Sequence, residues 1–410
     1  DGATNPQGTG GNKSVTVAQT ITLSGVNDAP VLADSVLTLS QAEDAVAPVG
    51  AVGSLVSALA AANISDVDAS AVKGLAITAT DSSHGTWHYS INGGTNWTAF
   101  TATDGTARLL AADANTRVYF QPTGNWHGGP IAAALTVRAW DKTTGSNGGT
   151  ADLSVPGTST GSATAFSSAT DTVALTVTPV NDAPSLSGTK TLPDVTEDNT
   201  SPAITAANIA TALTYSDATD DQTASSGGTT ATAHTALAIV GNAATAAQGT
   251  WQYTLNNGTL WTPVPTTVSN TTSIVLDLAN ADHQVRFVPV LNFAGVPGNL
   301  SLRASDGTWN SITGIQDISA LVGGTGAWSA DTGALAISVT AVNDPPVATD
   351  DTNSITENTA SVSGNVKTGT GGTLDTDPDT VNAGLSITAL RTGTEGAGTG
   401  TNIPLAAAFT

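Results

Sequence analysis

The sequence predicts an all-β fold repeated in tandem, and three observations carry that prediction. Apolar residues alternate with polar ones over short runs, as at Trp87, Tyr89 and Ile91, which is the period of a half-buried strand. Charged residues make up only 11% of the chain, and the abundance of Thr, Ser, Ala and Gly favours strands and turns. Finally, the heptad VNDAPVL at Val26 returns as VNDAPSL at Val180 and as VNDPPVA at Val342.

The repeat extends over whole domains. GTWHYSINGGTNW, which begins at Gly85, returns as GTWQYTLNNGTLW from Gly249, and VRAWD from Val137 returns as LRASD from Leu302. We therefore predict a terminal strand of a preceding repeat over 1–25, a first repeat over 26–179, a second over 180–341 and an incomplete repeat over 342–410.

The predicted elements follow the same periodicity in chain order. Apolar alternation before the first junction, over Ser14–Ser24, indicates a strand. Val52, Leu55, Val56 and Leu59 are spaced for one or two helical turns, the one exception to the strand pattern. The alternation from Trp87 then predicts a β-hairpin, and Val173, Leu175 and Val177 predict the strand that closes the first repeat. Stretches rich in Gly, Ser and Thr predict loops, notably Thr143–Thr164.

Charge and composition exclude several classes of function. The net charge of -22 leaves no basic surface for phosphates, so nucleic acid is not an expected partner. The chain has no cysteine, which excludes disulfides and thiolate metal sites. We expect no transmembrane segment, because no apolar run is long enough, and the first residues do not resemble a signal peptide. Since methionine is absent as well, we expect an interior piece, or a processed form, of a longer chain.

Catalysis has little support in the sequence. The segment GTSTG at Gly157–Gly161 matches a nucleophile motif, but it lies in a predicted loop and lacks the strand-to-helix turn that would expose Ser159. The five histidines fall mostly at positions that do not repeat, and no zinc triad or Ser-His-Asp set can be assembled from them. We predict a protein that is not an enzyme.

The junctions and long internal blocks resemble the cadherin-like repeats of giant RTX-type bacterial adhesins. The carrying residues are VTPVNDAP at Val177–Pro184, the block from Gly85, and FSSATDTVALTVTPVNDAP from Phe166. The segment Val347–Val366 is similar to the start of the VCBS repeats of the same proteins. The resemblance implies Greek-key (cadherin/Ig-like) β-sandwich domains in an extended rod, with Ca²⁺ at the junctions. The DRE-type acidic triplet of cadherins is missing, which implies fewer ions per junction.

Acidic residues that are scattered along the sequence can converge on these junctions. Val31–Ala42, if fully extended, spans roughly 40 Å, so it carries Glu43 to the far end of its domain. The chain then returns toward the first junction, where the strand that ends at Asp141 also finishes. Six to eight oxygen ligands suit calcium. The expected ligands are Asn27, Asp28, Asp66, Asp68 and Asp141 at the first junction; Glu43, Asn181, Asp182, Asp217, Asp220 and Asp306 at the second; and Glu197, Asn343, Asp344, Asp377 and Asp379 at the third.

Two points about these ligands stay open in the sequence. Asn-Asp and Asp-x-Asp segments also form Asx turns, in which the side chain caps its own backbone, and the two glutamates could be surface residues. The second repeat reads SDATDD where the first reads SDVD, so the choice among Asp217, Asp220 and Asp221 is undecided.

The resemblance, together with the acidic junctions, implies calcium-stiffened extender repeats of a secreted or cell-surface bacterial adhesin, of the kind that serves cell adhesion and biofilm formation. The expected partners are neighbouring repeats of the same chain, with a surface glycan or protein as the ligand of the whole adhesin. An alternative is a filament subunit, in which the strand over Ser14–Ser24 completes the unfinished repeat of the next subunit.

A second alternative is a carbohydrate-binding surface module. Most of the eight tryptophans recur in both repeats or alternate with Phe, which favours packing in the core. Trp140 and Trp309 lack aromatic counterparts, so we expect them to be the better candidates for exposed, sugar-stacking rings, together with the loop Thr143–Thr164.

Overall fold

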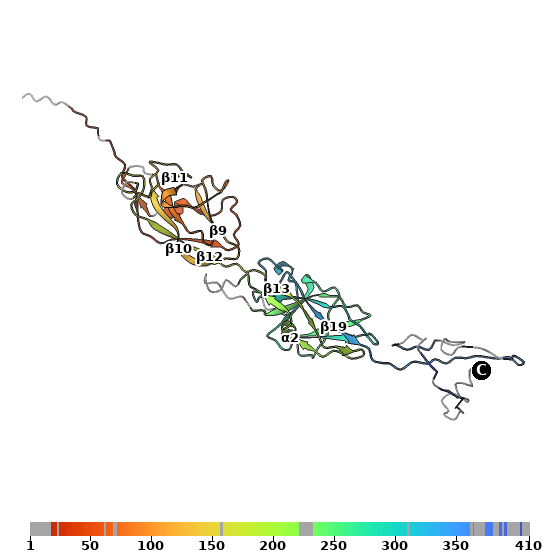
Figure 1. Ribbon diagram of the computed structural model, residues 1–410. Helices are drawn as coiled ribbons and strands as arrows, with labels where there is room; N and C mark the ends of the chain where they lie inside the picture. The colour runs from red at the N-terminus through yellow and green to blue at the C-terminus, as the bar shows by residue number, and fades with distance from the viewer. Residues whose placement is uncertain are drawn as a thin grey trace, which may run out of the picture. The chain divides into compact units, whose positions relative to one another are not determined.

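The computed structural model describes two compact units, one that ends at Pro179 and one that begins at Val180 (Figure 1). The described residues are 18–22, 24–60, 63–68, 72–155, 159–220, 233–309, 312–360, 364, 374–379, 385–387, 389–391 and 402–403. Each unit consists of β-sheets with one short α-helix. The prediction of an all-β protein with several β-sheet domains is therefore confirmed.

In the first unit, a six-stranded and a four-stranded sheet enclose the core. The six-stranded sheet has the order β11-β8-β5-β10-β12-β2, with strands Thr150–Ala151, Ala107–Ala111, Gly74–Thr80, Gly128–Trp140, Asp171–Thr178 and Leu37–Ala42. The four-stranded sheet has the order β3-β9-β6-β7, with strands Ser54–Leu55, Arg117–Pro122, Gly85–Ser90 and Thr98–Phe100. β1 (Val31–Leu32) pairs with β4 (Ile64–Ser65) beside them, and η1 covers Asp104–Thr106.

The side chains between these sheets identify the unit as a β-sandwich. Leu75 and Ile77 of β5 and Val137 of β10 are buried in one cluster with Trp87 of β6 and Phe120 of β9. Inward residues of two sheets that interdigitate in this way remove apolar surface from water, at about 25 cal/mol per Å². The hairpin expected around Trp87 is present as β6 and β7, which pair antiparallel.

The helical pattern in the first unit is confirmed over its second half. α1 covers Val56–Ala60 and buries Val56 and Leu59, whereas Leu55 belongs to β3 and Val52 is exposed. The turn before α1 needs Gly53, whose φ of +72° is unfavourable for other residues and whose position leaves no room for a Cβ beside the Val118 carbonyl. The helix therefore begins later than the pattern predicts.

Two strand predictions need correction. The run Val31–Ala42 is not one extended strand, because β1 pairs with β4 and only β2 joins the six-stranded sheet. Glu43 nevertheless follows β2, which runs parallel to the closing strand β12 and pairs Ala42 with Thr178. In the predicted strand over Ser14–Ser24, residues 18–22 are exposed and form no strand, and residues 14–17 and 23 lie outside the described residues.

The second unit repeats this architecture. Its six-stranded sheet has the order β14-β25-β23-β18-β21-β24, with strands Thr189–Thr191, Gly333–Ala336, Leu300–Ser305, Ala236–Asn242, Ser273–Asp277 and Gly314–Gln316. Its four-stranded sheet has the order β16-β22-β19-β20, with strands Ile204–Thr205, Gln284–Pro289, Gly249–Thr254 and Thr262–Pro263. α2 (Ala206–Ala210) occupies the place of α1, and Thr205 caps it by accepting a hydrogen bond from the Asn208 N–H.

Shorter elements complete the second unit. Two-stranded pairs are formed by β13 (Ser185–Ser187) with β17 (Thr214–Ser216), by β15 (Val195–Thr196) with β26 (Val339–Thr340), and by β27 (Leu390–Arg391) with β28 (Asn402–Ile403). The 3-10 helices η2 and η3 cover Asn270–Thr272 and Ser319–Leu321. The core again collects residues of both sheets, among them Trp251, Phe287, Leu237 and Leu302.

Each unit has a second, smaller core on the outer face of its large sheet, and the two units fill it with different residues. Trp140 ends β10 in the first unit and bridges to Phe166; in the second unit Ser305 and Trp328 stand at those positions. Trp140 and Trp328 are both fully buried. The expectation that Trp140 is exposed is thus wrong, because the ring packs in this outer core with Leu109 and Phe166. Trp309 is half-buried against Trp328, with 5.3 Å between ring centroids, so it is not a fully exposed ring either.

Candidate metal centres at the repeat junctions

At the first junction, the structure gathers the five residues that the sequence predicts. The Asn27 side-chain amide donates to Asp141 Oδ2 at 2.9 Å, and the Asp28 N–H donates to Asp68 Oδ2 at 2.9 Å. The Asp68 N–H in turn donates to Asp66 Oδ1 at 2.9 Å. Asp66 Oδ2 is shielded from solvent and has no hydrogen-bond partner among the described residues. The junction thus holds a carboxylate oxygen without a protein donor, which is a position that a cation can fill.

The second junction has the same construction within the second unit. The Asn181 amide donates to Asp306 Oδ2 at 3.0 Å, and the Asp182 N–H donates to Asp220 Oδ1 at 2.8 Å. Asp217, Asp220 and Asp306 are each at least nine-tenths buried. Asp220 therefore takes the place that Asp68 has in the first unit, which decides part of the choice that the sequence left undecided; Asp221 lies outside the described residues.

Burial of several carboxylates together has an electrostatic consequence. The pKa of Asp220 is raised to about 6, mainly by desolvation and also by the charges of Asp217, Asp182 and Asp306, while the hydrogen bond from the Asp182 N–H opposes the rise. A carboxyl group held among like charges favours its neutral form unless a positive charge is supplied. The second junction is therefore short of positive charge, and a bound cation would relieve that shortage.

The third junction brings three carboxylates closest together. Ligand oxygens of Glu197, Asp344 and Asp379 all lie within 4.8 Å of one another. Glu197 is only 2% exposed, and its Oε1 accepts a hydrogen bond of 2.6 Å from the Val342 N–H. This contact fixes the carboxylate beside the Asn-Asp segment. Three acidic oxygens at this spacing suit a hard divalent cation that prefers oxygen ligands.

The remaining residues of the third junction organise the same cluster. The Asp344 N–H donates to Asp379 Oδ2, and the Asp379 N–H donates to Asp377 Oδ1 at 2.9 Å. Asn343 is exposed and donates to the Asp344 carbonyl at 3.1 Å. Desolvation raises the pKa of Asp344, as do the charges of Asp198, Asp379, Glu197 and Asp377. Its Oδ2 is shielded and accepts no hydrogen bond from the described residues, so this cluster fits a cation.

Glu43, predicted for the second junction, lies in the first unit and is 2% exposed. Its Oε2 is 2.8 Å from Nδ1 of His127, which is also buried. The arrival of Glu43 beside residues of the second unit stays a prediction. The histidine partner could not be foreseen, because position 294 of the second repeat, which corresponds to His127, is an alanine.

The alternative reading as Asx turns is partly correct, and it coexists with a cation site. Asp141 Oδ1 accepts hydrogen bonds from the N–H and hydroxyl of Thr143 at 2.7 and 2.6 Å, and Asp306 Oδ1 accepts the same pair from Thr308. One carboxylate oxygen in each case caps its own turn. These threonines were not among the expected residues, although Asp-x-Thr is a repeated signal at both positions.

Comparisons with known proteins add little to this geometry. No protein-family model matches the chain, and no curated protein matches it significantly. Among solved structures, an endo-fucoidan hydrolase of glycoside hydrolase family 107 is similar at 14% identity and a TM-score of 0.22, covering 77% of this chain and 29% of its own. The protocadherin GammaB4 extracellular domain is similar at 14% identity and a TM-score of 0.20, covering 79% of this chain and 51% of its own.

These two similarities are distant, and the chain spans about a third and about half of the respective proteins. The β-sheet architecture described above stands on the strands themselves. Among the described residues, no helix is long and apolar enough to cross a membrane.

Proposed function

We propose that the chain consists of calcium-binding structural repeats, which act as a non-enzymatic extender of a secreted or cell-surface bacterial adhesin. The observation that carries the proposal is the cluster of Glu197, Asp344 and Asp379, whose ligand oxygens lie within 4.8 Å of one another. In a chain with only 11% charged residues, such proximity of like charges needs a compensating cation.

Calcium is the cation that the donor set favours. Every candidate ligand offers carboxylate, amide or carbonyl oxygen, and calcium takes six to eight oxygens in flexible geometry, whereas zinc prefers nitrogen and sulfur. When bound, calcium would neutralise the cluster. Glu197 would hold the ion from the body of the second unit, while Asp344 and Asp379 would hold it from the segment beyond Val342.

The mechanical role follows from the positions of the ligands along the chain. Glu197 directly follows β15, which runs parallel to β26, so it stands beside the Asn-Asp segment that comes after β26. Each junction carries the same Asn-Asp segment, so ions at such places would restrain successive repeats relative to one another. The sequence resemblance to bacterial cadherin-like and VCBS repeats supports the same role, and adhesion and biofilm formation are the functions proposed for the parent protein.

Thermal unfolding with and without calcium tests this proposal. Extracellular calcium modules bind with dissociation constants of roughly 0.1–1 mM, so about 10 mM calcium should stabilise the folded protein by about 1.4–2.7 kcal/mol per site over the EDTA-treated protein. Magnesium at the same concentration should stabilise less. Equal unfolding temperatures in EDTA and in calcium would contradict the proposal.

A further inference from the structure

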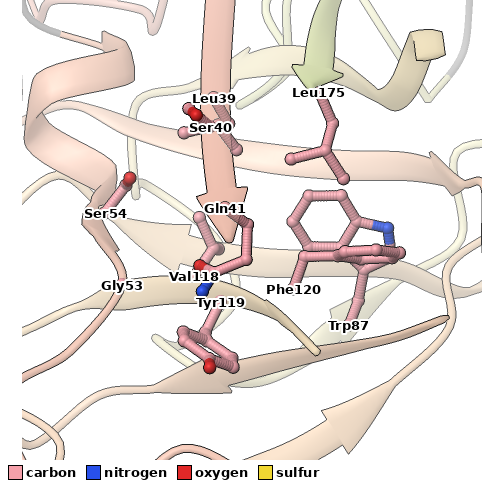
Figure 2. Close-up of a pocket in the computed structure, with 10 residues that line it drawn as sticks. All are labelled: Leu39, Ser40, Gln41, Gly53, Ser54, Trp87, Val118, Tyr119, Phe120 and Leu175. Atoms are coloured by element: carbon pink, nitrogen blue, oxygen red, sulfur yellow. The ribbon is translucent and has the colours of Figure 1, made fainter. Parts of the chain in front are cut away.

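A cleft opens into the first unit between the edge strand β2 and the four-stranded sheet (Figure 2). It has a volume of about 230 Å³, far above the roughly 10–15 Å³ that a single water requires. Trp87, Phe120 and Leu175 form its apolar floor, and Gln41 and Ser54 lie at its mouth. It is a solvent-accessible site and not a packing defect.

Phe120 borders this cleft, and its main-chain N–H and C=O lie on a strand edge that no described strand pairs with at this point. The Thr116 carbonyl accepts a hydrogen bond from the Val56 N–H, and Val118 pairs with Ser54. Because alternate residues of a strand face the same edge, the N–H and C=O of Phe120 face this edge too. The neighbouring chain has already turned away at Gly53, and no described residue pairs with Phe120 on this side.

The second unit closes the corresponding edge with its own chain. Phe287 pairs with Trp251 as Phe120 pairs with Trp87. The Ser201 N–H donates to the Phe287 carbonyl at 2.9 Å, and the Phe287 N–H donates to Ser201 Oγ at 2.8 Å. Ser201, which precedes a proline, is 3% exposed. A serine in an extended segment therefore satisfies both main-chain groups in one repeat and is missing in the other.

The residue at the mouth of the cleft also differs between the units: it is polar in the open first unit and apolar in the closed second unit. Gln41 pairs with Val177 in the first unit, as Val195 pairs with Val339 in the second. Val195 is buried, whereas Gln41 is half-buried and its side-chain amide makes no hydrogen bond to the described residues. The first unit thus places a free amide, with one donor group and one acceptor, where the closed unit has an apolar contact.

We propose that this cleft binds an extended segment of another polypeptide, with a Ser-Pro pair in the position that Ser201 and Pro202 occupy in the second unit. The serine main chain and hydroxyl pair with the N–H and C=O of Phe120, as a strand added at a free edge does. Gln41 hydrogen-bonds the main chain of the segment at the mouth. Ser201-Pro202 is the only Ser-Pro in this sequence, and Ser201 is buried against Phe287, so a second copy of the chain does not offer the ligand. The site requires no cation.

The test uses the full chain and a blocked pentapeptide with the sequence Asn-Thr-Ser-Pro-Ala, which copies residues 199–203. In a titration followed by amide NMR, we expect saturable shifts of the Phe120, Gln41 and Ser54 signals. A peptide with alanine in place of serine should bind about fivefold more weakly, because it lacks the hydroxyl acceptor. The Gln41→Val variant, which copies the second unit, should also bind several-fold more weakly.

Thr38→Val, on the outward face of the same strand, is the matched control and should bind like the unaltered protein. Equal unfolding temperatures of the two variants separate a binding effect from a folding effect. Three results would overturn the proposal: no saturable shift at millimolar peptide, equal binding of the serine and alanine peptides, or shifts confined to residues around Phe287.

Discussion

The side-chain amide of Asn27 donates a hydrogen bond of 2.9 Å to the carboxylate of Asp141, which follows it by 114 positions. The same contact recurs between Asn181 and Asp306 at 3.0 Å. In both cases the aspartate directly follows a central strand of the large sheet, β10 or β23, and is buried. The Asn-Asp segment thus joins the start of a repeat to one of its last strands, and it does so before any cation is considered.

Removal of this amide should destabilise the protein in EDTA. Asn27→Ala deprives the buried Asp141 carboxylate of a donor, and hydrogen bonds to charged groups contribute about 1.5–3 kcal/mol. We expect a decrease of that size in the free energy of unfolding of the first unit, measured by denaturant titration. Asn96→Ala, at an exposed asparagine whose side chain donates no hydrogen bond to the described residues, is the control and should change it little. Equal effects of the two substitutions would argue against the role of the contact.

The second junction should make stability depend on pH. Asp220 has a pKa of about 6 in the folded protein, against roughly 3.9 in an unfolded chain, so the folded state binds the proton more tightly. In EDTA, the free energy of unfolding should therefore fall as the pH rises from about 4 to about 6. The stabilising contribution is present below the unfolded pKa and is lost above the folded one.

The Asp220→Asn variant should not show this fall in stability. The difference between its pH profile and that of the unaltered protein removes the contribution of other groups that titrate in the same range, such as His234. Calcium should oppose the fall, because a cation favours the ionised carboxylate, and calcium affinity should weaken below about pH 6 for the same reason. Parallel profiles of the two proteins would exclude Asp220 as the titrating group.

The outer cores of the two units place their tryptophan on opposite sides of the same contact, which predicts a pair of substitutions that compensate each other. Trp140→Ser should destabilise the first unit by about 3–5 kcal/mol, because it empties a fully buried site. Phe166→Trp, added to it, should restore part of the loss, since the second unit packs Trp328 beside Ser305. A double-mutant cycle by denaturant unfolding measures this coupling. Simple additivity of the two changes would show that the outer cores are not interchangeable.

Ser201 should matter more than its neighbour in the chain. Ser201→Ala leaves the Phe287 N–H without its acceptor in a buried place, which should lower the free energy of unfolding of the second unit by about 1–3 kcal/mol. Thr200→Ala, at an exposed position, should have almost no effect. Hydrogen exchange at the Phe287 amide provides a local readout, and it should accelerate only in the Ser201 variant.

The sequence was sufficient for the fold class and for bringing together acidic residues within one unit, such as Asp28 with Asp68 and Asp182 with Asp220. Alternation around Trp87 located the central hairpin, whereas the arrival of Glu43 at the second junction stays a prediction. The fold class and the hairpin could be predicted because strand period and repeat spacing are local properties that tertiary structure had no reason to override.

The features that sequence reasoning missed depend on contacts between distant segments. Trp140 is buried because it lies beside Phe166. In the second unit the large residue is on the other side of the same contact, since Trp328 lies beside Ser305. The partnership of Glu43 with His127 joins residues that are 84 positions apart and that differ between the repeats. The cleft beside Phe120 likewise arises from the turn of the chain at Gly53, which alternation does not encode.

Calcium titration of the EDTA-stripped protein by isothermal titration calorimetry tests the central claim most directly. The proposal predicts saturable binding in the range of roughly 0.1–1 mM, with fewer ions bound per chain in Glu197→Gln than in the unaltered protein. Glu357→Gln, which changes an exposed glutamate outside the cluster, should keep the full stoichiometry. Absence of saturable binding, or equal stoichiometry in all three proteins, would contradict the assignment of Glu197, Asp344 and Asp379 as a calcium site.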